Sequence, residues 1–450
     1  MDKIFGTDGI RCLVNKEPLT AETCLKISKV VAYLLKSKKN VNSRVVVCKD
    51  TRLSGYFYEP LVTGGFISMG MDVILVGPLP TPAVPLLIKT LRADIGVMIT
   101  ASHNTYEYNG LKFFDSKGLK LSNKIEKKVE EIVLNKNKYS KIRNLSFKSG
   151  KAIRLEDASG RYSEFLKNTL DKKNNQKKYK IVLDCANGAT YNIAPNLFWE
   201  LGHEIHVIND KPNGTNINKN CGAVETTNLI KKVKNIKADI GFAFDGDGDR
   251  LIVVDDKGQE IDGDKIIALF SKFFVKKNIK NKYDVITTVM SNLAFENYIT
   301  NKLNLRLKRT NVGDINVIKG MKKYDSILGG EQSGHIILSN FANTGDGILA
   351  ALKIVEVMSI KRINSNSLFN LYKNYPQVKI NIFYEKISKQ KKKKILSISK
   401  NKQFLEKSIR TLIRFSGTEP LIRILVEGVD KKVVRNMANK IELEVRSKLD

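Results

Sequence analysis

The chain has 450 residues, of which 42% are hydrophobic, and it carries a formal net charge of +31. At roughly 100–200 residues per domain, this length allows about three or four domains around a large buried core. The five scattered cysteines form no C-x-x-C pair, no apolar run reaches about 18 residues, and the start lacks a signal-peptide layout, so we expect a cytoplasmic protein without a disulfide framework, zinc site or membrane span.

The positive charge allows two interpretations: an anionic partner such as nucleic acid, or a solvated lysine-rich surface. The excess is dispersed over several short runs, Lys36–Lys39, Lys172–Lys180 and Lys389–Lys394 among them. No basic stretch alternates with aromatic residues, as a platform for stacking bases would require. The pattern favours the solvated surface, and we expect neither a nucleic-acid nor a membrane partner.

The first third of the chain alternates short apolar runs with a helical pattern. Arg44–Cys48, Asp72–Val76 and Ile95–Thr100 read as buried strands, and Ala21–Lys36 has the 3.6-residue spacing of a helix. This alternation predicts an α/β fold with a mostly parallel sheet.

A serine motif follows the third of these strands, with the sequence Thr100-Ala101-Ser102-His103-Asn104. It places Ser102 at the carboxyl end of a strand, where open α/β sheets bind ligands. A serine nucleophile needs a base or electrostatic help, which His103 or Lys112 could supply. Taken alone, the motif is weak and favours an ordinary turn serine with a hydrogen-bonded histidine.

The strand pattern restarts in the second part of the chain with Lys180–Asp184, Ile205–Ile208 and Asp239–Phe244. The last of these runs leads directly into an acidic motif in which Asp245, Asp247 and Asp249 alternate with glycines. Hard carboxylate oxygens at this density suit Mg²⁺ or Ca²⁺, and the glycines let the loop curl around one ion.

Two alternatives to that metal loop remain: a structural acidic turn and an EF-hand. The EF-hand loop needs Gly at its sixth position and Glu at its twelfth, where this chain has Arg250 and Asp256. Both flanks also resemble strands rather than helices, which argues against the EF-hand.

A third set of elements comprises strands at Val285–Val289 and Ser326–Leu328, with helices near Gly263–Phe274 and Gly345–Ser359. The second strand precedes a loop that runs from Gly329 to His335 and contains Glu331 and Ser333. Such a loop can approach a polyhydroxylated ligand closely, and His335 could act as acid or base. A tight turn with a hydrogen-bonded histidine is the alternative.

The last 80 or so residues differ, with strands at Val378–Tyr384, Thr411–Phe415 and Leu421–Val426, a lysine-rich connection, and a helix from Lys431. They predict a smaller α+β unit. Its loop offers forked guanidinium donors, hydroxyls and main-chain amides that could bind a phosphate dianion, from Arg414, Ser416, Gly417, Thr418 and Arg423. A surface turn is the alternative.

Polar stretches at 135–150 and 361–367 separate the sets. The fold class is therefore α/β, with three tandem α/β domains, whose sheets are mixed or mostly parallel, and a smaller α+β C-terminal domain. The expected limits are 1–147 with the serine loop, 148–252 with the metal loop, 253–366 with the sugar-binding loop and 367–450 with the phosphate loop.

Taken together and in this order, the motifs resemble the α-D-phosphohexomutase superfamily, most closely the bacterial phosphoglucosamine mutases, over essentially the whole chain. Further motifs carry the resemblance: Phe5-Gly6-Thr7-Asp8-Gly9-Ile10-Arg11, Lys49-Asp50-Thr51-Arg52-Leu53-Ser54-Gly55, Pro80-Thr81-Pro82, Asp184-Cys185-Ala186-Asn187-Gly188-Ala189, Pro212-Asn213-Gly214 and Thr344-Gly345-Asp346-Gly347. The resemblance implies four domains around a central cleft, each contributing one loop.

The resemblance also implies residue roles. Ser102 would be the phosphoserine, and its oxygen would join Asp245, Asp247 and Asp249 around one Mg²⁺ per subunit. Lys112 and His335 would be acid/base groups, with Arg11 beside the transferring phosphoryl group. The substrate-binding residues would be Glu331 and Ser333 for the sugar hydroxyls, and Arg414, Ser416, Gly417, Thr418 and Arg423 for the phosphate that does not react.

The implied reaction converts glucosamine 6-phosphate to glucosamine 1-phosphate through a bisphosphate, toward cell-wall precursors. The expected partner is thus a phosphorylated amino-sugar substrate, with a hexosamine 1,6-bisphosphate as activator and the oligomeric state left open. The alternative within the superfamily is a phosphomannomutase/phosphoglucomutase.

Two positions depart from the family pattern. Thr105 stands where the family has Pro after Ser102-His103-Asn104, and Pro would rigidify the loop. Ile315-Asn316 stands where phosphoglucosamine mutases commonly have Arg-Tyr. The second departure affects the choice of sugar more than the reaction itself.

Overall fold

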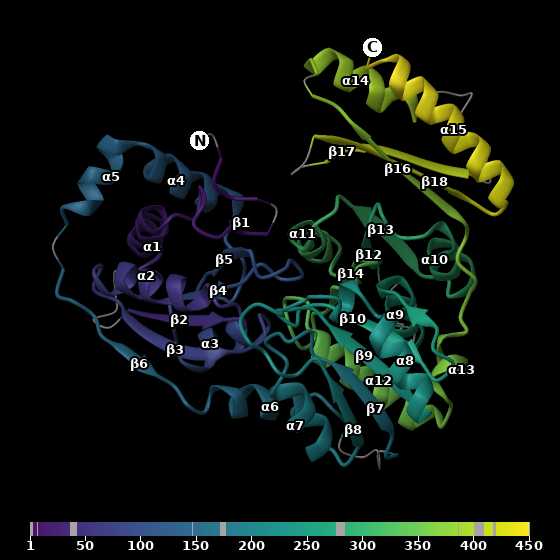
Figure 1. Cartoon of the computed structure of the whole chain (residues 1–450), viewed down its shortest axis with the longest axis horizontal. Helices are drawn as coiled ribbons and strands as arrows, with labels where there is room; N and C mark the ends of the chain where they lie inside the picture. Colours follow the sequence, from purple (N-terminus) through teal and green to yellow (C-terminus); the bar gives the residue numbers. More distant parts are fainter. Residues whose placement is uncertain are drawn as a thin grey trace.

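The computed structural model describes residues 3–6, 8–36, 43–145, 147–171, 177–275, 284–385, 387–399, 409–416 and 420–449. Four sheets follow one another along the chain, with six, five, four and three strands. Figure 1 shows the fourth sheet and its two helices beside the third sheet, at the opposite end of the molecule from helices α6 (Ala158–Asn168) and α7 (Ile193–Glu200).

The first sheet has the order β1-β5-β4-β2-β3-β6 and is mixed. Its core of β4, β2, β3 and β6 is parallel, whereas β5 and β1 are added antiparallel. Its elements are β1 (Ile10–Leu13), α1 (Ala21–Leu35), β2 (Arg44–Lys49), α2 (Gly55–Ile67), β3 (Asp72–Pro78), α3 (Ala83–Thr90), β4 (Ile95–Ile99), β5 (Tyr108–Phe114), α4 (Asn123–Leu134), α5 (Lys136–Arg143) and β6 (Ala152–Arg154).

The second sheet has the order β11-β10-β9-β7-β8, with parallel β8, β7 and β9. Its elements are α6 (Ala158–Asn168), β7 (Lys180–Asp184), α7 (Ile193–Glu200), β8 (Glu204–Ile208), α8 (Thr227–Ile236), β9 (Ile240–Phe244), β10 (Leu251–Asp255) and β11 (Glu260–Ile261). Strands β9 and β10 form an antiparallel pair, so the metal loop between them connects two buried strands.

The third sheet has the order β13-β12-β14-β15, and the antiparallel fourth has the order β16-β18-β17. The third unit consists of α9 (Gly263–Phe270), β12 (Asp284–Thr288), α10 (Leu293–Asn297), β13 (Arg306–Thr310), α11 (Asp314–Tyr324), β14 (Leu328–Gly330), β15 (Ile336–Leu338), α12 (Gly347–Lys361) and α13 (Ser365–Phe369). The fourth consists of β16 (Gln377–Phe383), α14 (Lys389–Ile398), β17 (Ile409–Phe415), β18 (Leu421–Gly428) and α15 (Lys431–Ser447).

Parallel strands such as β2 have continuous apolar sequences because both of their faces are buried. Val45, Val46, Val47 and Cys48 of β2 are fully buried, because helices cover both sides of the parallel core. One apolar cluster continues from the α3 face of the first sheet through the second and third units, whereas the fourth unit has a cluster of its own. The first three units are therefore packed together, and the fourth is built separately.

Several segments differ from the expectation. Helices α5, α13 and α14 lie in the stretches that we predicted to be separators or a lysine-rich connection. In α14 only Ile395 and Ile398 are buried, and the lysine-rich run that precedes them hides the helical pattern. Strand β6 extends the first sheet beyond residue 147, and β11 extends the second beyond 252; the domain limits themselves stay a prediction.

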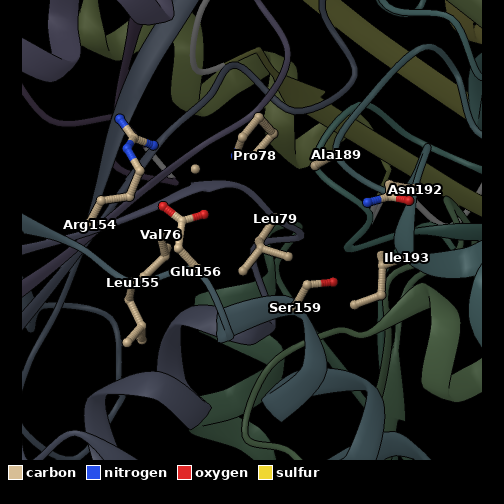
Figure 2. A pocket seen from close by; sticks show the side chains of 11 residues that line it. Val76, Pro78, Leu79, Arg154, Leu155, Glu156, Ser159, Ala189, Asn192 and Ile193 are labelled. Carbon is tan, nitrogen blue, oxygen red and sulfur yellow. The ribbon is translucent and has the colours of Figure 1, made fainter.

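The seam between the first and second units contains a cavity of about 190 Å³. Leu79 and Ile193 contribute apolar surface to it, and Ser159 and Asn192 contribute polar groups (Figure 2). None of the predicted site residues lines it, so we do not connect it with the chemistry. Within the described parts of the chain, no helix combines the length and apolar character needed to cross a bilayer.

Adjacent glycines in α2 test how closely α1 and α2 pack. A Cβ at Gly65 would lie 2.5 Å from the Cβ of Ser28 on α1, whereas a Cβ at Gly64 would meet nothing within 4 Å. Gly65→Ala should therefore destabilise the first unit by about 1–3 kcal/mol through overpacking. Gly64→Ala should stabilise it by about 0.5–1 kcal/mol because the helix loses a glycine. Midpoints of thermal unfolding check both, and equal shifts in the two variants would contradict the packing.

Candidate active site

Ser102 lies directly after β4 in the first unit and meets the metal loop of the second. Its hydroxyl donates to Asp245 Oδ2 at 2.7 Å, and its residue is 1% exposed. Its backbone is left-handed, with φ of 52°, a conformation that non-glycine residues seldom adopt. The first-unit serine and the second-unit carboxylates thus form a single site.

The three carboxylates of the metal loop are buried and close together. Asp245, Asp247 and Asp249 offer oxygens that all lie within 4.8 Å of one another. Burial raises the pKa of Asp245 well above its usual range, and repulsion from Asp249 and Asp247 adds to the effect. Within the described parts of the chain, Asp247 Oδ1 is buried without a hydrogen-bond partner. This donor set suits a hard divalent cation.

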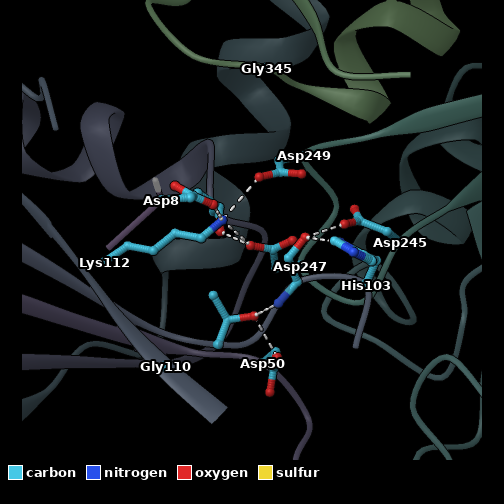
Figure 3. Close-up of polar contacts among 12 residues, drawn as sticks. Asp8, Asp50, His103, Gly110, Lys112, Asp245, Asp247, Asp249 and Gly345 are labelled. Atoms are coloured by element: carbon cyan, nitrogen blue, oxygen red, sulfur yellow. Dashed lines mark hydrogen bonds and ion pairs between the residues drawn. The ribbon is translucent and has the colours of Figure 1, made fainter. Parts of the chain in front are cut away.

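Lys112 of β5 lies among these carboxylates (Figure 3). Its ammonium is 2.8 Å from Asp247, 3.1 Å from Asp249 and 3.0 Å from Asp8. Burial by itself would lower the pKa of Lys112, but the three carboxylates raise it well above its ordinary value. Lys112 is therefore charged here and offsets part of the negative charge.

A second lysine connects the first unit to the third. Lys120 forms ion pairs with Asp8 and with Asp314, which is the first residue of α11. Neither Lys120, Asp8 nor Asp314 was among the predicted site residues. Asp8 nevertheless belongs to the motif Phe5–Arg11 noted above, and Asp314 directly precedes the departure at Ile315-Asn316, so these two positions were the available signal.

His335 of the third unit is buried and faces the same cluster. Its Nδ1 lies 3.6 Å from Asp249 Oδ1, and its Nε2 accepts a hydrogen bond from the Gly345 N–H at 3.1 Å. Burial would lower the pKa of His335, but Asp249 raises it above its usual value. Gly345 lies so close that a Cβ there would be 2.5 Å from the imidazole. The histidine ring is thus held firmly against the metal loop.

Arg11 and His103 flank the serine loop. Arg11 donates to Asn104 Oδ1 at 3.1 Å and lies 3.5 Å from Asp8. His103 Nδ1 is 3.4 Å from the Ser102 hydroxyl. Burial, together with the positive charges of Arg250 and Arg11, lowers the pKa of His103 to about 3, so its imidazole is neutral.

The third-unit loop abuts the metal loop without touching Ser102 in any described contact. Glu331 Oε1 accepts from the Gly313 N–H at 3.0 Å, whereas Ser333 is exposed. A Cβ at Gly334 would lie 2.3 Å from the Leu251 carbonyl oxygen. The loop therefore needs glycine to lie this close to the strand that follows the metal loop.

Of the predicted phosphate loop, Arg414 lies on β17 and Arg423 on β18 of the fourth sheet, and Figure 1 shows these strands apart from β9 and β10. Arg414 and Arg423 are direct cross-strand neighbours, and Ser416 follows β17. Burial lowers the pKa of Arg414, and the charge of Arg423 lowers it further. Like charges directly opposite each other are unfavourable, which suits an anion-binding role. Gly417 and Thr418 lie outside the described residues.

Comparison with known families agrees with this arrangement. Four family models match in sequence order: the alpha/beta/alpha domains I, II and III of phosphoglucomutase/phosphomannomutase over residues 2–140, 160–258 and 262–377, and the C-terminal domain over 380–444. They correspond in order to the four sheets.

Individual relatives extend over nearly the whole chain. The phosphoglucosamine mutase of Thermodesulfovibrio yellowstonii is 43% identical over 444 residues, which cover 98% of each chain. The solved structure of a phosphoglucomutase/phosphomannomutase family protein from Burkholderia thailandensis superposes with a TM-score of 0.85 at 22% identity, covering 100% of this chain and 98% of that one. Aspergillus fumigatus N-acetylphosphoglucosamine mutase, solved with GlcNAc-6P and magnesium, gives 0.63 at 17% identity, covering 99% and 96%.

Removal of one carboxylate tests the metal loop. Mg²⁺ should raise the thermal unfolding midpoint of the wild type, because a ligand that binds only the folded state stabilises it. Asp247→Ala should lose most of this shift, since it removes one of three carboxylates. Glu164→Gln, which neutralises an exposed carboxylate in the same unit, should keep it. Equal Mg²⁺-induced shifts in both variants would refute the assignment.

Proposed function

The chain belongs to the phosphoglucomutase/phosphomannomutase family, whose members are isomerases, and we propose that it interconverts glucosamine 6-phosphate and glucosamine 1-phosphate. The observation that carries the proposal is the Ser102 hydroxyl, held 2.7 Å from Asp245, one of three buried carboxylates that lie close together. Its curated relatives bear the name phosphoglucosamine mutase at 42–44% identity.

Ser102 would carry the phosphoryl group between the two positions of the sugar. In the first step the Oγ–P bond of phosphorylated Ser102 breaks and a bond forms between phosphorus and a sugar hydroxyl oxygen, which gives the bisphosphate. After the bisphosphate has turned round, its other phosphoryl group returns to the Ser102 Oγ. Such transfers require mainly positioning and charge neutralisation.

The residues around Ser102 would supply that neutralisation. Asp245, Asp247 and Asp249, with an oxygen of phosphorylated Ser102, would hold one Mg²⁺ per subunit, which when bound neutralises phosphoryl charge. Arg11 lies beside the serine loop through its bond to Asn104. It would therefore contribute a cation next to the transferred group.

Lys112 and His335 would handle the hydroxyl proton of the sugar. Both face Asp249, and carboxylates raise the pKa of each. The protonated form of each, which the raised pKa favours, would donate a proton to the sugar oxygen when the phosphoryl group leaves it. In the first step the neutral form would accept the proton of the attacking sugar hydroxyl, and the Ser102 Oγ would gain a proton as its bond to phosphorus breaks. Glu331 and Ser333 of the third unit would bind the sugar hydroxyls.

The fourth unit would grip the phosphate that does not react. Arg414 and Arg423 place two guanidinium groups opposite each other, and a dianion between them would relieve their repulsion. Ser416, Gly417 and Thr418 would complete this loop. A hexosamine 1,6-bisphosphate would act as activator by phosphorylating Ser102, and the substrate would be a phosphorylated amino sugar in the cytoplasm.

Catalytic efficiencies on three sugars test the substrate, and one variant tests the nucleophile. We expect kcat/KM to be highest for glucosamine 6-phosphate; a preference for glucose or mannose 6-phosphate would favour the alternative, a phosphomannomutase/phosphoglucomutase.

Ser102→Ala should abolish turnover while the fold survives, because only a hydroxyl can carry the phosphoryl group. Activity above a few per cent in this variant would exclude the phosphoserine route.

Truncation of one arginine tests the fourth-unit loop. Because the gripped phosphate is present in ground state and transition state alike, Arg423→Ala should act mainly on KM. A charge-assisted hydrogen bond is worth about 1.5–3 kcal/mol, so kcat/KM should fall about 10- to 150-fold. Lys379→Ala removes an exposed cation from the neighbouring strand β16 and should change neither constant. A collapsed kcat with unchanged KM would instead place Arg423 at the transferring group.

A further inference from the structure

Arg52 is a fully engaged arginine beneath the serine loop, and it is 1% exposed. Its Nη2 donates to the carbonyl oxygens of Ser102 at 2.9 Å and Asn104 at 2.8 Å. Its Nη1 donates to the carbonyls of Thr105 and Tyr108, and its Nε donates to Asp50 at 2.8 Å. All five N–H donors of the guanidinium are therefore used, four of them on one loop.

A ring of hydrogen bonds closes around the backbone of Ser102. The Ser102 N–H donates to Thr100 Oγ1 at 2.9 Å, and that hydroxyl donates to Asp50 Oδ2 at 2.6 Å. Asp50 in turn accepts from Arg52, whose Nη2 returns to the Ser102 carbonyl. Both polar backbone groups of Ser102 are thereby fixed while its side chain stays directed at Asp245.

Asn218 holds the same loop from the second unit. Its amide nitrogen donates to the carbonyl oxygens of Ser102 and Asn104, at 2.8 Å each. Since Arg52 already donates to these two oxygens, both lone pairs of each carbonyl are engaged. The residue is 4% exposed, and its own N–H is bound to the Ala186 carbonyl at 2.9 Å.

The metal loop also contacts the Ser102 carbonyl and the Asn218 side chain. A Cβ on Gly246 would be 2.6 Å from the Ser102 carbonyl oxygen and 2.7 Å from the Asn218 amide nitrogen. The Ser102 backbone, the Asn218 side chain and the metal loop thus touch one another. Asn218 belongs to the unit that carries the carboxylates, so its two hydrogen bonds join the serine loop to that unit.

We propose that Arg52 and Asn218 are positioning residues for phosphoryl transfer: Arg52 fixes the left-handed shape of the serine loop, and Asn218 fixes its place against the metal loop. The proposal rests on the proposed mutase function. Thr105 gives this loop no proline to stiffen it, so side-chain hydrogen bonds must hold the strained φ of Ser102. Neither residue is assigned contact with the sugar, so both should act on transfer rather than on substrate binding.

Two variants of Asn218 test this. Asn218→Gly removes the side chain but accepts the positive φ of 56° at this position, and Asn218→Asp keeps the shape but removes both donors. At about one kcal/mol per hydrogen bond, each variant should lower kcat by about 10-fold or more and leave KM within about twofold. The single-turnover rate of Ser102 phosphorylation by a hexosamine 1,6-bisphosphate, followed by intact mass, should fall in parallel.

Lys219→Ala is the matched control, since it alters an exposed neighbour on the same loop and should behave as wild type. For folded Asn218 variants, a kcat within about twofold of wild type, or a rise in KM that accounts for the whole loss, would overturn the proposal. Arg52→Lys keeps the charge beside Asp50 but loses the fork. If it folds, it should reduce kcat further than the Asn218 variants.

Amide hydrogen exchange separates this proposal from the mutase function. The amides of Ser102 and Asn104 should exchange faster in Asn218→Gly than in wild type or Lys219→Ala, whether or not the wild type turns over a sugar phosphate. A wild type without mutase turnover would refute the proposed function. The exchange rates would still show whether Asn218 holds the serine loop in place. Unchanged exchange rates in Asn218→Gly would refute the positioning role of Asn218, even in an active enzyme.

Discussion

The structure is organised around buried negative charge. Asp245, Asp247 and Asp249 are almost inaccessible to solvent, and buried carboxylates are costly unless cations and hydrogen bonds compensate them. The first unit supplies Lys112, and its Thr81 hydroxyl donates to Asp247 at 2.6 Å. From the third unit His335 faces Asp249, and the N–H of Gly347 donates to the Gly248 carbonyl at 3.0 Å. The need to compensate one loop therefore fixes how the first three units meet.

The described residues of the fourth unit take no part in compensating the buried carboxylates, and this unit is attached to the other units differently. Its apolar cluster is separate, and Arg410 provides a polar connection by donating to the carbonyls of Val289 and Ser291 while it pairs with buried Glu427. A polar interface of this kind leaves relative motion of domains as the default expectation. Under the proposed function, a phosphate-binding loop on such a unit would release and rebind a bisphosphate that turns round, while the site around Ser102 stays rigid.

The sequence predicts what is local and misses what the tertiary fold assembles. The strands β2, β4 and β9 were predictable because burial on both faces leaves uninterrupted apolar runs, whereas short edge strands such as β6 and β11 leave none. The motifs of Ser102 and of the three aspartates could be singled out because each is contiguous, and their roles stay a prediction. Lys120 with Asp314 and Asn218 with Ser102 are separated by 194 and 116 residues, and no local spacing in the chain indicates that either pair meets.

At Ile315-Asn316, one such distant contact explains why the chain can depart from the family pattern. Ile315 lies at the edge of a small cavity that Lys112 and Lys120 also line, and its own N–H donates to Asp314 Oδ1 at 2.7 Å. Asp314 forms an ion pair with Lys120, which comes from the first unit rather than from α11. An arginine at 315 would bring a third positive charge toward two lysines, at a cost in repulsion. With Lys120 on Asp314, the apolar Ile315 leaves the charge balance around Lys112 intact. Under the proposed function, it would change mainly the surface that this loop offers to the sugar.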